Sequence, residues 1–237
     1  MPPDDHSPLG HARRYTSECY DGMRDDQART AAYRRAIQRA AKGQVVCDIG
    51  TGALALLALI AAEAGAKHVY AIEVNASVAA AARAAVAAAG FSEIVTVLDG
   101  FSTDVELPRE RAALLVHELI GEVAGEEGVV AAITDARRRF MDPIAPPPFS
   151  IPARTRSLLA PCEYPDATYV ARFPPELLEA PGSGRALKCP GLPQTCRLAA
   201  AQAFEDLRFE RGAPQPSQHA TLDFVLEREG QWRGLAI

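Results

Sequence analysis

Residues 44–73, QVVCDIGTGALALLALIAAEAGAKHVYAIE, decide the fold that we expect for this chain. The apolar run 45–47 leads into the turn sequence Asp-Ile-Gly-Thr-Gly at 48–52. A helical run follows over 53–64, and residues 68–72 have strand character again. This pattern predicts one strand–helix–strand unit of the nucleotide-binding type.

Small residues at the turn indicate close contact between backbone and ligand. Gly50 and Gly52 allow a strand to reverse into a helix within a few residues, and Ala55 is the third small position of the usual pattern. Glu73 ends the second strand, where a carboxylate can accept both hydroxyls of a ribose. We therefore assign Gly50, Gly52 and Glu73, together with Asp48 of the turn, to cofactor binding.

Composition indicates a globular chain without a nucleic-acid footprint. The chain has 237 residues, 48% of them hydrophobic, and a net charge of −5, which suits a small cationic substrate but also serves solubility alone. Its five cysteines are widely spaced and show no metal-ligand pattern, so we expect reduced thiols, a cytoplasmic location and no metal. The start of the chain lacks the pattern of a secretion signal, and residues 53–64 are too few to cross a bilayer.

Alternating helices and strands extend beyond the central unit. A helical pattern over 25–40 precedes it, and Asp25 or Asp26 is expected as cap or first-turn acid. After it come a helix at 76–89 ending at Gly90 and strands at 94–98 and 111–118. The fold class predicted is α/β, a Rossmann-like doubly wound parallel sheet.

We expect three segments along the chain. Residues 1–14 form a flexible N-terminus, residues 15–142 form the cofactor-binding domain with its N-terminal helix, and residues 146–237 form a smaller β-rich domain. The proline-rich stretch 141–148 is the expected linker, and an irregular insertion is expected near 174–195. The chain ends inside a strand-like run, so a truncated C-terminus is one expectation.

Two acids near the fourth strand form the candidate reaction centre. Glu118 ends that strand, and Gly121 and Gly125 allow a hairpin that brings Glu127 back over it. Two converging carboxylates would hold a planar cation. The alternative treats Glu127 as a first-turn acid of the next helix and Glu118 as a surface acid at a strand end.

At this point the order and spacing of five motifs resemble the protein arginine methyltransferase family. The motifs are MRDDQARTAAYRRAI at 23–37, CDIGTG at 47–52, AIE at 71–73, VELP at 105–108 and HELIG…E at 117–127. The nine residues from Glu118 to Glu127 match the spacing of the two loop glutamates of the family. The resemblance covers residues 15–140 well and the rest loosely. It implies a class I methyltransferase domain followed by a smaller barrel-like β domain, with S-adenosyl-L-methionine as the cofactor.

The resemblance also implies roles for individual residues. Arg29 would meet the cofactor carboxylate and Met23 its sulfonium, and Gly50 and Gly52 would lie under its methionine portion. The residues Ser102 and Thr103 would lie at the adenine edge. The implied catalytic acids are Glu118, Glu127 and Asp26. The residues expected only in the substrate neighbourhood are Tyr15, Tyr20 and His117.

The expected activity is methyl transfer to a guanidino group. A guanidinium has a pKa above about 12 and delocalised lone pairs, so two carboxylates that orient it address its poor nucleophilicity. The acceptor is free arginine, an arginine-derived metabolite or an arginine in a peptide or protein. The small residues Val123, Ala124 and Gly125, where the family has bulky ones, favour a small acceptor, as in a bacterial member acting on small molecules.

Other features keep alternatives open. His117 stands where the family usually has serine, and Trp232 lacks the preceding Thr-His of a late family motif. The alternatives are a small-molecule O- or N-methyltransferase of natural-product metabolism on the same scaffold and a catalytically degraded cofactor-binding scaffold protein. By resemblance, we also expect a homodimer as one assembly. From the net charge and the short apolar run we expect neither nucleic acid nor membrane as a partner.

Overall fold

The computed structural model describes residues 25–121, 123–163, 192–209 and 218–237. The predicted site residues Tyr15, Tyr20 and Met23 lie outside these ranges, as does most of the insertion expected near 174–195. The chain divides into two compact units, the first made of Met1–Thr155 with Asp206–Gln218, the second of Arg156–Glu205 with His219–Ile237. In the described part, no helix combines the length and the apolar character that crossing a membrane requires.

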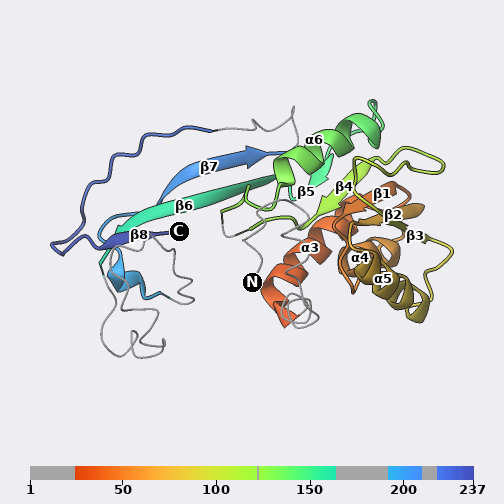
Figure 1. The fold of residues 1–237 in the computed structure, drawn as a ribbon, viewed down its shortest axis with the longest axis horizontal. Helices are drawn as coiled ribbons and strands as arrows, with labels where there is room; N and C mark the ends of the chain where they lie inside the picture. The colour runs from red at the N-terminus through yellow and green to blue at the C-terminus, as the bar shows by residue number, and fades with distance from the viewer. Residues whose placement is uncertain (1–24, 122, 164–191, 210–217) are drawn as a thin grey trace. The chain divides into compact units, whose positions relative to one another are not determined.

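A five-stranded sheet forms the centre of the first unit (Figure 1). Its strands are β1 (Val45–Ile49), β2 (His68–Glu73), β3 (Val95–Asp99), β4 (Leu114–His117) and β5 (Ser150–Ile151). They lie in the order β3-β2-β1-β4-β5, and all neighbours are parallel. The chain leaves β1 toward β2 and leaves β4 toward β5, in opposite directions along the sheet, so a crevice is expected at the carboxyl ends of β1 and β4. The doubly wound, Rossmann-like prediction is confirmed.

Helices cover both faces of this sheet: α3 (Gln27–Ala40), α4 (Leu56–Glu63), α5 (Ala76–Ala88) and α6 (Val129–Arg139). Local signals begin two of them. Asp26 caps α3 by accepting from the Arg29 N–H, and Asn75 caps α5 by accepting from the Ser77 and Val78 N–H groups. The N-cap of α4 is Ala55, which has a left-handed φ of 45° although it is not glycine.

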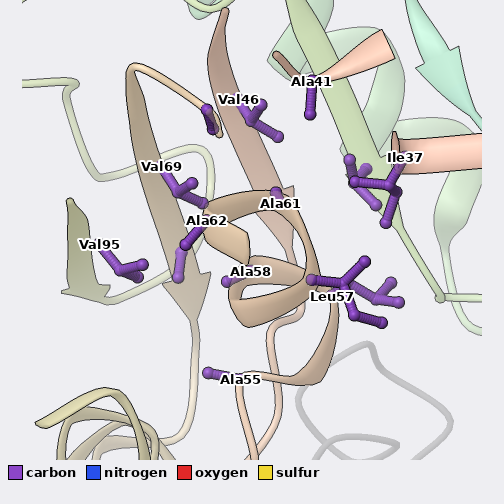
Figure 2. Close-up of a cluster of buried hydrophobic side chains, with 14 of the residues drawn as sticks. Ile37, Ala41, Val46, Ala55, Leu57, Ala58, Ala61, Ala62, Val69 and Val95 are labelled. Carbon is purple, nitrogen blue, oxygen red and sulfur yellow. The ribbon is translucent and has the colours of Figure 1, made fainter. Parts of the chain in front are cut away.

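One core lies between the sheet and α3, α4 and α5. Figure 2 shows its alanine-rich centre, where Ala58, Ala61 and Ala62 of α4 lie close to the strands. Val46 of β1 and Val69 of β2 point into the same cluster and are fully buried. The small side chains let α4 pack close to the strands, which fixes the distance between the turn before α4 and the strand ends.

The opposite face of the sheet packs against α6. Ile133 and Ala136 of α6 lie with Cys47 of β1 in a second core, which Leu207 and Phe209 complete from a distant part of the chain. The odd and even residues of β1 therefore enter different cores, as expected for a central strand buried on both faces.

The strand at 150–159 differs from its expected form. Ser150–Ile151 pairs in parallel with β4 and so belongs to the first unit, and β6 (Arg154–Cys162) starts only after Pro152. The expected boundary at 142–146 thus precedes the last strand of the parallel sheet. Linker-like proline content concealed this strand, because two residues are too few to show periodicity.

The second unit is built on a small sheet in the order β7-β6-β8. Its other strands are β7 (Gln202–Arg208) and β8 (Gly234–Ala236), and a 3-10 turn, η1 (Gln194–Cys196), precedes β7. β6 and β8 are antiparallel, with Ala160 opposite Ala236. The expectation of a separate β-rich part after the parallel sheet is therefore confirmed, whereas its barrel-like closure remains a prediction.

Candidate cofactor and acceptor site

A cavity of about 290 Å³ lies at the carboxyl ends of β1, β2 and β4, where the topology predicts a ligand crevice. Helices α3 and α6 add residues to its wall. Eight of the residues predicted from sequence line it: Arg29, Gly50, Gly52, Glu73, Ser102, Thr103, Glu118 and Glu127. These residues come from segments that are distant in sequence, and the fold brings them around one volume.

The glycine turn forms the floor between the two strand ends. The Gly50 and Thr51 N–H groups donate to the Ile72 carbonyl at 2.9 and 3.0 Å, which ties the turn to β2. Gly50 has a φ of 74°, and a Cβ there would lie 2.5 Å from Leu119 Cδ2. The positive φ favours glycine at this position, and any larger side chain would also have to displace the end of the Leu119 side chain.

Glu73 lines the cavity at the end of β2. Its Oε2 accepts from the Gly52 N–H and its Oε1 from the Asn75 N–H, both at 3.0 Å. Burial raises the pKa of Glu73, and these backbone bonds oppose the rise. A carboxylate has about four lone-pair sites, so Glu73 keeps capacity to accept from a ligand hydroxyl while backbone N–H groups hold it in place.

Glu118 lines the cavity just after β4, and it binds a guanidinium of the chain itself. Arg29 of α3 places Nη1 3.0 Å from Glu118 Oε2, with side chains 26% and 21% exposed. The pKa of Glu118 is raised to about 7, mainly by burial. The Arg29 charge opposes this rise and the Glu127 charge adds to it. Near neutral pH this carboxyl group can therefore both bind a cation and exchange a proton.

Tyr33, one helical turn after Arg29, anchors α3 to the end of β4. Its hydroxyl donates to the His117 carbonyl at 3.0 Å, next to Glu118 in sequence. Burial, followed by the Glu118 charge, raises the pKa of Tyr33 well above its usual range, so the phenol stays protonated and remains a donor. This bond fixes the part of α3 that carries Arg29.

The loop after Glu118 returns Glu127 to the same cavity. The Glu126 N–H donates to the Val123 carbonyl at 2.9 Å and the Gly128 N–H to the Gly125 carbonyl at 3.2 Å. Glu127 lines the cavity, and its charge raises the pKa of Glu118. The Glu126 side chain packs against Gly121 instead, where a Cβ would lie 2.2 Å from Glu126 Cγ. The two acids therefore differ: Glu127 faces the cavity and Glu126 closes the hairpin.

Three predicted residues, Asp26, Asp48 and His117, do not line the cavity. Asp26 is exposed and accepts the N-cap bond of α3, so its expected role beside the substrate stays a prediction. Asp48 is buried below the turn, where Thr51 Oγ1 donates to its Oδ2 at 2.7 Å, and burial raises the pKa of Asp48 to about 7. It supports the turn from beneath.

His117 is a core residue. It is fully buried, its ring meets Phe209 edge-on at 4.8 Å, and burial lowers the pKa of His117 to about 3. The Ser150 hydroxyl donates to the Pro152 carbonyl and lies 3.2 Å from His117 Nε2, so Nε2 carries the proton that Ser150 Oγ accepts. His117 thus ties β4 to β5 and does not line the cavity.

Tyr33, Leu119 and Phe101 also line the cavity and were missed by the sequence analysis. A signal existed for Tyr33, since residues i and i+4 of a helix share a face and Arg29 was already assigned to the site. Leu119 and Phe101 carried no such signal, because apolar residues after strand ends are common in cores.

The residues present fit an adenosyl cofactor. Gly50 and Gly52 of the turn line the cavity, Glu73 offers oxygen acceptors, and Phe101 and Leu119 supply apolar wall. Among the residues that the structure describes, no group of three or more His, Cys, Asp or Glu side chains could hold a metal ion.

Comparison with curated proteins finds arginine methyltransferases. The chain is 34% identical over 150 residues to the probable protein arginine N-methyltransferase 6 of Arabidopsis thaliana, an alignment covering 62% of this chain and 33% of that protein. It is 32% identical over 127 residues to protein arginine N-methyltransferase 1 of Dictyostelium discoideum, covering 52% and 37%. The chain thus spans about a third of the length of these relatives. No protein-family model matches.

Solved structures agree in fold. Arabidopsis thaliana protein arginine methyltransferase 10 superposes with a TM-score of 0.68 at 23% identity, covering 84% of this chain and 64% of that chain. A Trypanosoma brucei PRMT1 enzyme-prozyme complex with AdoHcy gives 0.62 at 21% identity, covering 79% and 61%. The predicted resemblance is therefore confirmed: this chain is similar to protein arginine methyltransferases in sequence over 52–62% of its length, and it shares the fold of solved arginine methyltransferase structures over most of it.

Proposed function

We propose that this protein is an S-adenosylmethionine-dependent N-methyltransferase that acts on the guanidino group of arginine. The observation that carries the proposal is the ion pair in the cavity, where Glu118 already binds a guanidinium, that of Arg29, at 3.0 Å. A carboxylate that holds one guanidinium in this setting can hold that of an acceptor by the same bonds.

The cofactor would lie along the glycine turn. Gly50 and Gly52 allow close approach of its methionine portion, and Glu73 would accept from its ribose hydroxyls. When bound, S-adenosylmethionine supplies an electrophilic methyl group on a sulfonium. Support comes from relatives whose solved structures contain the demethylated cofactor, the Trypanosoma PRMT1 complex with AdoHcy and PRMT6 with SAH.

Glu118 and Glu127 would hold the acceptor. Two carboxylates facing one cavity fix the plane of a guanidinium and offset its repulsion from a cationic cofactor. Methylation of a guanidinium nitrogen releases one proton. Glu118, with a pKa of about 7, can take that proton at a carboxylate oxygen and pass it to water. This step requires Arg29 to leave Glu118 when the acceptor enters.

Within this class we propose that free arginine or a small arginine derivative is accepted, alongside arginine in a peptide. The support is the loop between the two acids, where Val123, Ala124 and Gly125 are small and Ala124 is buried. A small loop leaves the acceptor end without the bulky side chains that would grip a long substrate.

Labelled methyl transfer tests the proposal. The protein is incubated with methyl-labelled S-adenosylmethionine and, separately, free arginine, agmatine, an arginine peptide, the matched lysine peptide and a catechol. We expect label in guanidines only, and loss of that label in Glu118→Gln. Label in the catechol or lysine peptide alone would replace the proposal with another methyltransferase activity. Cofactor binding without transfer to any acceptor would indicate a degraded scaffold.

Self-association is a separate proposal, drawn from a relative whose solved structure is a heterotetrameric complex. Light scattering on the purified chain, with and without S-adenosylhomocysteine, measures it directly. A mass of twice 25.3 kDa would support a homodimer, and 25.3 kDa in both states would contradict it.

A further inference from the structure

We propose that Arg139 is a positioning residue for cofactor binding, because it ties the loop after β3 to the last turn of α6. This inference rests on the proposed function, since that loop supplies one wall of the proposed cofactor cavity. The loop residues that line it are Gly100, Phe101, Ser102 and Thr103. Arg139 itself does not line the cavity and would act through them.

The loop after β3 forms a tight turn, and Arg139 donates to two of its carbonyl groups. The Asp104 and Val105 N–H groups both donate to the Phe101 carbonyl, at 2.9 and 3.1 Å. Arg139 Nη1 donates to the Ser102 carbonyl at 2.6 Å, and Nη2 donates to the Val105 carbonyl. One planar guanidinium thus binds the loop at two points three residues apart, which a single donor could not do.

Arg139 is in turn held from its own helix. Its Nη1 lies 3.3 Å from Asp135 Oδ2, and its guanidinium carbon lies 5.1 Å from the centre of the Phe140 ring. The Asp135 side chain is 13% exposed and that of Arg139 is 23% exposed. Contacts on both sides leave the guanidinium little freedom, so the loop takes up the position that α6 dictates.

Helix α6 therefore links the two ends of the cavity. It begins directly after Glu127 and Gly128, lines the cavity through Ala131 and Ala132, and ends at Arg139. At about 1.5 Å per residue the helix is about 16 Å long, enough to run along one wall of a site for a nucleoside-sized ligand. Loss of the Arg139 bonds should release the loop end of this wall and leave the Glu118 and Glu127 end in place.

The experiment compares Arg139→Met, Arg139→Lys and the control Arg138→Met. Arg138 is adjacent, also pairs with Asp135, and is 78% exposed, so its removal changes charge equally without touching the loop. Calorimetry with S-adenosylhomocysteine measures Kd. We expect Kd to rise about tenfold in Arg139→Met, less in Arg139→Lys, and by under about twofold in Arg138→Met.

Hydrogen exchange supplies a readout without ligand or turnover. In Arg139→Met the Asp104 and Val105 amides should exchange faster, while those of β1 and α4 keep native rates. Unchanged Kd together with unchanged loop exchange would overturn the inference and leave the proposed function intact. If Arg139→Met does not fold, Arg139→Lys carries the same test through its single retained donor group. No binding of S-adenosylhomocysteine by the native chain would overturn both.

Discussion

Glu73 ends β2 and Glu118 directly follows β4, on either side of β1 in the same sheet, yet their carboxylates are held in different ways. Glu73 accepts from two backbone N–H groups, that of Gly52 in the turn after β1 and that of Asn75, the N-cap of α5. Glu118 is held by the side chain of Arg29, which belongs to a separate helix and is 26% exposed. One acid is fixed by backbone and the other is paired with a side chain that can exchange.

The difference separates two tasks within one cavity. A carboxylate fixed by backbone donors suits a ligand that binds in one pose, such as a ribose. A carboxylate with a pKa of about 7 and a replaceable cation suits a group that arrives, reacts and leaves. Substitutions at one end of the cavity should therefore leave the function of the other end unchanged.

The largest effect is expected from Glu118→Gln. Removing one member of a partly buried charge pair should lower kcat/KM for a guanidine acceptor by about 100-fold or more. Cofactor affinity should change by under about twofold, since Glu73 and the turn are untouched. Steady-state kinetics and calorimetry measure the two quantities. The control Glu110→Gln removes an equal charge from a surface pair with Lys67 and should leave both unchanged. Equal loss of cofactor affinity would erase the distinction between the two ends.

Gly50→Ala should disturb both ends, because Gly50 packs against Leu119, which follows Glu118. A Cβ there would meet Leu119 Cδ2 at 2.5 Å in addition to the positive φ. We expect the free energy of unfolding to fall by about 2–3 kcal/mol, measured by urea denaturation. Gly43→Ala is the matched control, with a φ of 72° and nothing within 4 Å of the added Cβ, and should cost about 1–2 kcal/mol. Equal losses would show that the Leu119 contact is relaxed easily.

Glu73→Gln should affect the cofactor end alone. The glutamine side chain has one acceptor oxygen, so it can accept from only one of the two backbone N–H groups that bind Glu73. We therefore expect the affinity for S-adenosylhomocysteine to fall about tenfold. At saturating cofactor, KM for the acceptor should stay within about twofold of native. Glu93→Gln is the control, since Glu93 is exposed and lies before β3. A larger effect on the acceptor than on the cofactor would reverse the assignment of the two acids.

The smallest effect concerns pH. Protonated Glu118 cannot pair with a guanidinium, so acceptor kcat/KM should rise with pH through the Glu118 pKa of about 7. Between pH 8 and 6.5 the ionised fraction, and with it kcat/KM, should fall about fourfold. Because the Arg29 charge lowers this pKa, Arg29→Met should move the midpoint upward, by about one pH unit. A profile that falls with rising pH, or a midpoint that Arg29→Met leaves in place, would contradict the role given to Glu118.

Much of this site could be predicted from local sequence, because several of its residues lie at the ends of strands. Gly50, Glu73 and Glu118 each terminate a strong strand pattern, and the edge where parallel strands end is the same for all. What local patterns could not show are contacts made between elements. The Arg29–Glu118 pair depends on how α3 docks on β4, and the Arg139 bonds depend on where a loop some 35 residues earlier lies.

The burial of His117 was missed for the same reason. In the sequence His117 directly precedes Glu118, which suggested a place near the substrate. In a strand, however, neighbouring side chains point to opposite faces. Its partner Phe209 comes from far along the chain and only the folded structure brings the two rings to 4.8 Å. The short strand β5 was likewise hidden, since two residues between prolines carry no periodic signal.

The central claim is that Glu118 exchanges the guanidinium of Arg29 for that of an acceptor, and a binding titration without turnover tests it most directly. Arginine is titrated calorimetrically into the native protein and into Glu118→Gln, each saturated with S-adenosylhomocysteine, at pH 8 and at pH 6.5. The account predicts binding by the native protein that is tighter at pH 8, and loss of that binding in Glu118→Gln at both pH values. Equal arginine affinity in the two proteins would contradict it.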